Sequence, residues 1–103
     1  MRCGMTLLLA LALVFSSWAS HAEALKVRVG VYQNSPKIFI DQDGKAAGIL
    51  VDMLRQIAEE ENWDLSFTAC KWVSCLDQLQ RGEIDLLPDV AYSAARAKRF
   101  DFH

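Results

Sequence analysis

The chain has 103 residues, with 11 basic and 13 acidic side chains and a formal net charge of −2 at pH 7. This mild acidity argues against a nucleic-acid partner, which calls for basic residues clustered on one face. Lys98-Arg99 is the one adjacent basic pair, and we expect it on the solvated face of a helix. The length is enough for one small core, at the low end for a stable domain.

The N-terminus has the layout of a secretory signal peptide. Arg2 gives a positive start, an apolar run covers Leu7–Phe15, and small-x-small cleavage motifs end at Ala22 and Ala24. The apolar run is too short for a membrane anchor, because spanning a bilayer takes roughly 20 apolar residues. The sequence therefore predicts a cleavable signal peptide over residues 1–24, with the cleavage position left open between the two alanines.

An exported chain meets an oxidising compartment, where paired cysteines are normally disulfides. Cys3 leaves with the signal peptide, so Cys70 and Cys75 remain as a pair. Within one helix their Cα atoms would be about 7.5 Å apart along the axis, which exceeds the roughly 7 Å limit for a disulfide. The bridge therefore requires Cys70 to lie in the loop before the helix that holds Cys75. A C-x4-C spacing does not favour a redox role, and two thiols with a terminal His103 do not make a zinc site, so we expect no metal.

The elements alternate between strand and helix patterns along the chain. Strands are predicted at Lys26–Tyr32, Trp63–Thr68 and Ile84–Leu87. Helices are predicted from Gly48 to Asn62, from Trp72 to Leu79 before Gly82, and from Ala94 to Arg99 after an N-cap at Ser93. A hairpin-like excursion is predicted over Lys37–Ala47. This order indicates an α/β fold over residues 25–103, an open parallel sheet with helices on both faces.

Right-handed crossovers place the carboxyl ends of the three strands at one edge, where ligands bind in such sheets. The loops that meet there supply the candidate ligand-binding residues, which are Tyr32, Trp72, Asp89, Tyr92 and Arg96. A guanidinium binds a carboxylate in bidentate fashion, a carboxylate accepts an ammonium group, and aromatic faces flank flat or cationic groups. The set therefore suits a small zwitterion such as an amino acid.

Each candidate also has a structural interpretation that the sequence leaves open. Tyr32 and Tyr92 are also suited to packing, Trp72 lies on the apolar stripe of its helix, Asp89 can cap a turn, and Arg96 can be a surface arginine. Asp85, in the third strand, is expected to bond nearby backbone or to pair with a base, without a ligand role. No catalytic residue and no cofactor is expected, because no G-x-S-x-G or phosphate-loop motif is present.

Three stretches carry a family resemblance: VRVGVYQNSPKIFID, DGKAAGILVDMLRQIAEE and LQRGEIDLLPDVAYSAARAKRFDF. They resemble the first lobe of the bacterial family 3 solute-binding proteins, which have the periplasmic type II fold. The resemblance implies that Arg96 holds a ligand carboxylate, that Tyr32 lies in a loop supplying a stacking aromatic, and that residues 88–91 bind the solute. Pro88-Asp89 replaces the usual small or hydroxyl residues, and Ile49 stands where an aromatic is frequent.

The C-x-W-x-x-C-L helix start and the PDVAYS loop also resemble periplasmic sensor domains of histidine kinases and diguanylate cyclases. The expected partner is therefore a small solute, with an ABC-transporter permease or a fused sensor kinase in full-length relatives. The expected location is the periplasm. The resemblance further implies a second lobe, so the chain is expected to be a fragment that binds its solute weakly alone. An enzyme on the same fold, either a dehydratase or a peptidoglycan-cleaving enzyme, and a structural adaptor are the alternatives.

Overall fold

The structure, a computed structural model, describes residues 23–103. The predicted signal peptide lies outside the described residues, except for Glu23 and Ala24, which are exposed. Within the described part of the chain, every helix falls short of the length and apolar character needed to cross a membrane. The signal peptide and its cleavage position therefore stay predictions.

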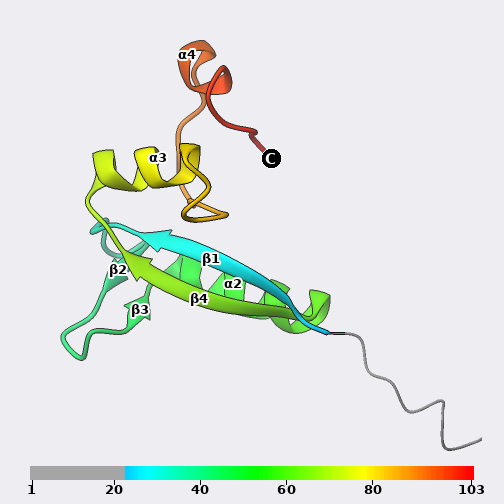
Figure 1. The fold of residues 1–103 in the computed structure, drawn as a ribbon. Coiled ribbons are helices and arrows are strands. Elements are labelled where there is room, and N and C mark those ends of the chain that lie inside the picture. The colour runs from blue at the N-terminus through cyan, green and yellow to red at the C-terminus, as the bar shows by residue number, and fades with distance from the viewer. Residues whose placement is uncertain (1–22) are drawn as a thin grey trace, which may run out of the picture.

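Two parallel strands form the centre of the fold. Strand β1 (Leu25–Val31) pairs with β4 (Trp63–Ala69), with Val27 opposite Leu65 and Val29 opposite Phe67. The β-branched valines favour this extended backbone, because their side chains pack well on a pleated surface. Both predicted strands are confirmed, and Figure 1 shows their arrows pointing to the same end of the molecule.

The connection between β1 and β4 contains a small hairpin and then a helix. Strand β2 (Phe39–Ile40) pairs antiparallel with β3 (Ala46–Ala47), and α2 (Ile49–Glu61) follows. Gly48 begins the helix with φ 114°, and a Cβ at this position would lie 2.5 Å from the carbonyl oxygen of Lys37. Glycine is therefore required at this junction. The predicted excursion and first helix are both confirmed.

Helix α3 (Trp72–Gln80) lies on the opposite side of the strands from α2. A Cβ at Gly30 would come within 3.3 Å of the Sγ atom of Cys70, on the side where α3 begins. Side chains alternate along a strand, so Val29 and Val31 point to the other side, where they are almost completely buried. Figure 1 shows α2 behind the strand pair and α3 above it. The predicted α/β fold with a parallel sheet is confirmed.

The prediction of a third full strand at Ile84–Leu87 is wrong, because only Leu86 bridges to Val29 in parallel fashion. The reason lies in Asp85, whose carboxylate accepts a hydrogen bond from the backbone N–H of Arg28 at 2.9 Å. That N–H is therefore lost to the regular ladder. The carbonyl oxygen of Arg28 in turn accepts from the N–H groups of both Asp85 and Leu86.

The last helix, α4 (Ala94–Ala97), is shorter than the predicted stretch to Arg99. Its start follows the prediction, since the Ser93 side chain accepts a hydrogen bond from the N–H of Arg96 at 3.1 Å. The Arg96 carbonyl accepts from the N–H groups of both Arg99 and Phe100, which turns the chain and buries the Phe100 ring. The helix ends early because the chain turns back toward the core.

One hydrophobic cluster joins these elements into a single core. Its buried members come from β1, the excursion, α2, α3 and the C-terminal segment: Val31, Tyr32, Ile38, Ala46, Val51, Cys75, Leu76, Ile84, Leu87 and Phe100.

Candidate functional site

Tyr32 directly follows β1 and stands at the carboxyl end of the strand pair. Its side chain is buried, and its hydroxyl donates to the carbonyl oxygens of Pro88 at 3.2 Å and Asp89 at 3.0 Å. Burial raises the pKa of the Tyr32 phenol above its ordinary value, an effect that a hydrogen bond with Asn34 opposes. The phenol therefore remains protonated and keeps donating to the loop at residues 88–89.

Trp72 is the first residue of α3 and packs edge-on against Tyr32, with ring centroids 4.8 Å apart. It lies inside the small ring closed by the Cys70–Cys75 disulfide, whose Cα atoms are 5.3 Å apart. Cys70 lies in the loop after β4 and Cys75 lies in α3, where it is fully buried. The predicted disulfide and its placement are confirmed, and the bridge fixes the loop that presents Trp72.

Arg96 reaches the indole of Trp72 from α4. Its guanidinium carbon lies 5.5 Å from the Trp72 ring centroid, within the range of a cation–π contact. One of its terminal nitrogens donates to the carbonyl oxygen of Ala91 at 3.0 Å. The guanidinium is thus held between the indole and the loop before α4.

Asp89 lies beside the turn that follows β1. Its backbone has φ 60°, in the left-handed region that non-glycine residues rarely adopt. Its carboxylate accepts a hydrogen bond from the side chain of Asn34 at 3.1 Å and pairs with Lys37 at 3.3 Å. Neither of these two contacts was predicted from the sequence.

Tyr92 is separate from this group. Its side chain is 70% exposed and packs edge-on against Phe102, with ring centroids 5.4 Å apart. Of the five predicted residues, the structure thus brings Tyr32, Trp72 and Arg96 into one row. The backbone carbonyl of Asp89 accepts a hydrogen bond from Tyr32 of this row, whereas Tyr92 contacts Phe102 instead.

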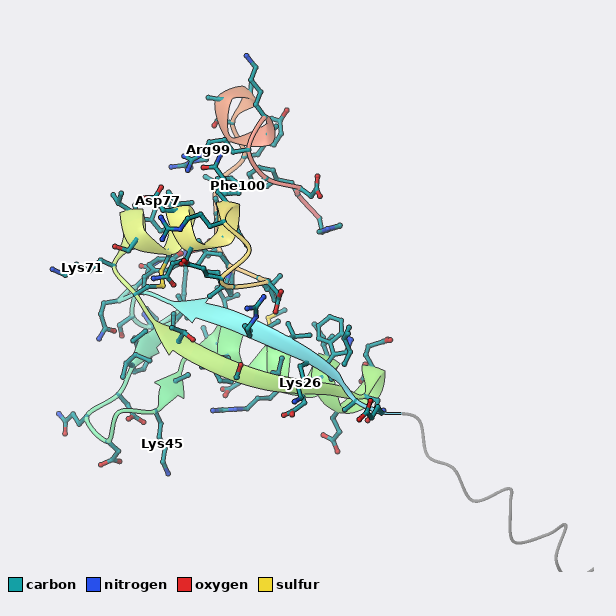
Figure 2. The ribbon with its side chains drawn as sticks, viewed as in Figure 1. Lys26, Lys45, Lys71, Asp77, Arg99 and Phe100 are labelled. Atoms are coloured by element: carbon teal, nitrogen blue, oxygen red, sulfur yellow. A yellow bond between two sulfur atoms is a disulfide. The ribbon has the colours of Figure 1, made fainter. Side chains whose placement is uncertain are left out.

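Arg99, which the sequence reasoning treated as surface, connects the row to the fold. Its guanidinium contacts the side chains of Gln80 at 2.8 Å and Asp77 at 3.4 Å, both on α3. Figure 2 shows Arg99 and Phe100 between α4 and α3, with Asp77 on the facing side of α3. These contacts hold α4 against α3, and α4 carries Arg96.

A hollow of about 550 Å³ lies elsewhere, beside the single bridge at Leu86 and the C-terminal segment. Val27, Ile84 and Phe100 contribute to its lining, but Tyr32, Trp72 and Arg96 do not. Across residues 23–103, no three His, Cys, Asp or Glu side chains gather closely enough to hold a metal ion. The row of aromatic and basic side chains is the candidate site, in which Tyr32 is buried and Trp72 and Arg96 are partly exposed.

The chain combines a parallel α/β lobe with a basic and aromatic row at the carboxyl edge of its strands. The family model for bacterial extracellular solute-binding proteins, family 3, matches residues 27–103, and the chain belongs to this family. The predicted resemblance is thereby confirmed.

Solved structures with the periplasmic-binding-protein type II fold are similar to the chain. A histidine kinase sensor domain with similarity to periplasmic binding proteins is 33% identical, with a TM-score of 0.68, over 74% of this chain and 33% of that chain. The L-cystine solute receptor of Neisseria gonorrhoeae, in its unliganded open conformation, is 27% identical, with a TM-score of 0.62, over 71% of this chain and 32% of that chain.

An ancestral amino-acid-binding protein, described as a precursor of cyclohexadienyl dehydratase, is 25% identical, with a TM-score of 0.63, over 71% of this chain and 33% of that chain. The chain therefore spans about a third of the length of these three solved relatives. No curated protein matches the chain.

Proposed function

We propose that this lobe is the solute-binding part of an exported periplasmic protein and receives a carboxylate group of a small polar solute, such as an amino acid. Arg96 receives the carboxylate, and Trp72 and Tyr32 form the wall beside it. The observation that carries the proposal is the position of the Arg96 guanidinium, 5.5 Å from the Trp72 ring centroid at the carboxyl edge of the strands.

The chemistry of the row supports a carboxylate. A guanidinium has five N–H donors in a planar fork, and in Arg96 one terminal nitrogen donates to the carbonyl of Ala91. The remaining donors suit the two oxygens of a carboxylate, which makes charge-assisted hydrogen bonds stronger than neutral ones. The indole of Trp72 shields one side of the guanidinium from water. A direct ligand contact of Asp89 or of the exposed Tyr92 remains a prediction from the sequence.

The comparisons favour binding over catalysis. Two of the three relatives above are described as a histidine kinase sensor domain and a solute receptor. The higher identity to the sensor domain, together with the C-x-W-x-x-C-L and PDVAYS segments, favours ligand sensing over uptake by an ABC-type transporter. In either role the lobe contributes the same event, the capture of the solute.

An NMR titration of the ¹⁵N-labelled chain with propionate and with a panel of L-amino acids tests the proposal. We expect the Trp72 indole N–H and the Arg96 Nε–H signals to shift, and the Trp72 shift to disappear in Arg96→Met. Arg81→Met is the matched control, because it removes the same charge from an exposed arginine that pairs with Glu83. Equal shifts in Arg96→Met and in the unmodified chain would contradict the proposal.

A second candidate function is enzymatic, a dehydratase on the same fold. It is favoured by the ancestral relative whose description names it a precursor of cyclohexadienyl dehydratase. Incubation of the chain with a cyclohexadienyl acid separates the two candidates. Formation of an aromatic product would support the enzyme, whereas reversible binding with an unchanged compound supports a binding lobe.

A further inference from the structure

Strand β4 is an edge of the sheet. Among residues 23–103 it pairs with β1 alone, and Figure 1 shows it at the outside of the strand pair. The N–H of Cys70, just after β4, donates to the carbonyl of Val31 at 2.9 Å. The carbonyl of Asn62, just before β4, accepts from the N–H of Leu25 at 3.2 Å. Because backbone polar groups point alternately to the two sides of a strand, the even-numbered residues of β4 bond to β1 and the odd-numbered ones point outward.

The outward backbone groups of β4 form a continuous row. They belong to Trp63, Leu65, Phe67 and Ala69, whose N–H groups make no hydrogen bond within the described part of the chain. Natural edge strands are usually protected by proline, by lysine, by a bulge or by a short length. Strand β4 is seven residues long, has the sequence WDLSFTA and keeps one regular register with β1. It therefore has none of these protections, and Asp64 is its one charged residue.

The sequence of β4 suits an antiparallel partner with the same sequence. With the two-fold axis at Ser66, each outward residue lies opposite an outward residue of the other copy, and the two exchange N–H···O bonds. Leu65 then lies opposite the partner's Phe67, and Asp64 lies opposite the partner's Thr68. Apolar pairs across two strands stabilise a sheet, whereas like charges directly opposite destabilise it. This register contains an apolar pair and no pair of like charges.

Helix α2, which packs against β4, is compatible with such a neighbour. The guanidinium carbon of Arg55 lies 5.5 Å from the centroid of the Phe67 ring, so this arginine lies over the strand. Arg55 also contacts the carboxylate of Asp52 at 3.9 Å. Two copies joined through β4 therefore bring charges of both signs together beside the sheet, and not two basic surfaces.

We propose that β4 is a docking edge for a second copy of this chain. The two copies form one continuous sheet with the strand order β1-β4-β4-β1, and the two β4 strands run antiparallel about Ser66. This contact goes beyond the proposed function, because its axis lies in the middle of β4, whereas Trp72 and Arg96 lie beyond the carboxyl ends of the strands.

Sedimentation equilibrium measures the association, and amide hydrogen exchange locates it. We expect the chain to be monomeric when dilute and dimeric when concentrated. The N–H groups of Leu65 and Phe67 should exchange quickly in the monomer and slowly in the dimer, because the second copy supplies their hydrogen-bond acceptors. Ser66→Lys places two like charges opposite each other at the axis, so dimerisation should weaken about fivefold or more.

A mixing experiment tests the register itself. Ser66→Glu should also weaken dimerisation, whereas an equimolar mixture of Ser66→Lys and Ser66→Glu should associate again, because opposite charges then meet at the axis. The side chain of Ser66 is exposed, so both variants should keep the fold. Ser74→Lys is the matched control, since it makes the same substitution at an exposed position of α3 and should dimerise like the unmodified chain.

The outcomes decide the proposal without reference to the solute. Slow exchange of Leu65 and Phe67 in the dimer, lost in Ser66→Lys and regained in the mixture, supports it. A chain that stays monomeric at every concentration overturns it. A dimer that Ser66→Lys and Ser74→Lys leave equally stable also overturns it, because the contact then lies on another surface. The propionate titration is read separately, so failure of the proposed function leaves this test unchanged.

Discussion

Tyr32 connects segments that lie far apart along the chain. Its ring packs against Trp72 at the start of α3, while its hydroxyl binds the carbonyls of Pro88 and Asp89. The side chain is therefore both a core residue and a wall of the candidate site. Different parts of the side chain have these two roles: the ring packs against Trp72, and the hydroxyl donates to the loop at residues 88–89.

Tyr32→Phe should destabilise the chain by about 1 kcal/mol, since it removes two partly buried hydrogen bonds to carbonyl groups and keeps the ring. Urea unfolding followed by circular dichroism measures the change in the free energy of unfolding. Tyr92→Phe is the matched control, with an expected change near zero, because that side chain is 70% exposed. Equal losses in the two variants would contradict the assigned hydroxyl contacts.

Asp85 is the residue whose charge depends most clearly on its neighbours. Arg28 hydrogen-bonds its carboxylate through both the guanidinium and the backbone N–H, which lowers the pKa of Asp85 to about 2 from an ordinary 3.8. A carboxyl group whose pKa is lowered by folding stabilises the folded state at every pH above its ordinary pKa. This contribution is lost as the pH falls from about 3.8 through about 2.

Asp85→Asn should therefore cost about 0.5–1 kcal/mol at pH 7, a modest value because both side chains of the pair are largely exposed. The difference from the unmodified chain should narrow toward zero near pH 2. Thermal unfolding between pH 2 and pH 7 measures it. Glu83→Gln, which removes the same charge from the exposed pair with Arg81, is the matched control. A difference independent of pH would rule out the ion pair as its cause.

The sequence predicted the types of residue at the site better than their contacts. Arg96 follows the N-cap at Ser93, and Trp72 follows the loop cysteine Cys70. These local patterns predicted that both residues lie at the carboxyl edge of the strands. The pairing of Lys37 with Asp89 joins residues 52 positions apart and depends on a left-handed backbone at Asp89. Local patterns carry no signal for such a contact, because it forms only after both turns are in place.

At the scale of elements, the disulfide connects the loop after β4 to α3. Cys70 lies outside the helix and Cys75 is buried within it, so the bridge ties the end of β4 to the helix. A ring this small contributes about 2 kcal/mol by restricting the unfolded chain. Trp72 lies inside the ring, so the bridge also limits the positions available to the indole.

Reduction with a phosphine should lower the free energy of unfolding by about 2 kcal/mol and should weaken the propionate response of Trp72. Denaturant unfolding with and without the reductant measures the first effect, and the NMR titration measures the second. A Cys70→Ala, Cys75→Ala double variant is the control, because the reductant should leave it unchanged. Unaltered stability of the reduced chain would mean that packing alone holds the loop.

The third strand shows where periodicity fails at this scale. Ile84–Leu87 has a strand-like apolar run, and Ile84 and Leu87 are buried as a strand would require. Yet the carboxylate of Asp85 takes the backbone N–H of Arg28, which a regular ladder would use. The apolar run therefore predicts correctly which residues are buried. It does not predict the partner of the Arg28 N–H, because the alternation of apolar and polar residues carries no information about the hydrogen bonds of the Asp85 side chain.

At the scale of the whole molecule, the order of strands and helices was enough to predict the α/β lobe. Parallel strands need a crossover connection, and the helical stripe between the first two strands supplied it. The exposure of the candidate site could not be predicted from this order. In this row Tyr32 is buried while Trp72 and Arg96 are partly exposed, and these exposures depend on packing between segments far apart along the chain.

An open site sets the affinity expected of this chain alone. Charge-assisted hydrogen bonds contribute about 1.5–3 kcal/mol each, and two of them from Arg96 must also offset the loss of freedom on association. Pockets with high affinity bury most of the ligand, and this row does not. We therefore expect a dissociation constant for propionate in the millimolar range, which corresponds to about −4 kcal/mol.

The same reasoning gives the salt dependence. Because the guanidinium meets water on its open side, raising the ionic strength from about 0.01 to 0.5 M should weaken propionate binding several-fold, as the screening length shrinks. NMR titrations at the two salt concentrations measure the dissociation constants, with Arg81→Met as the variant that should bind normally. Micromolar binding by calorimetry, insensitive to salt, would mean that the chain encloses the solute, which an open row of three side chains does not.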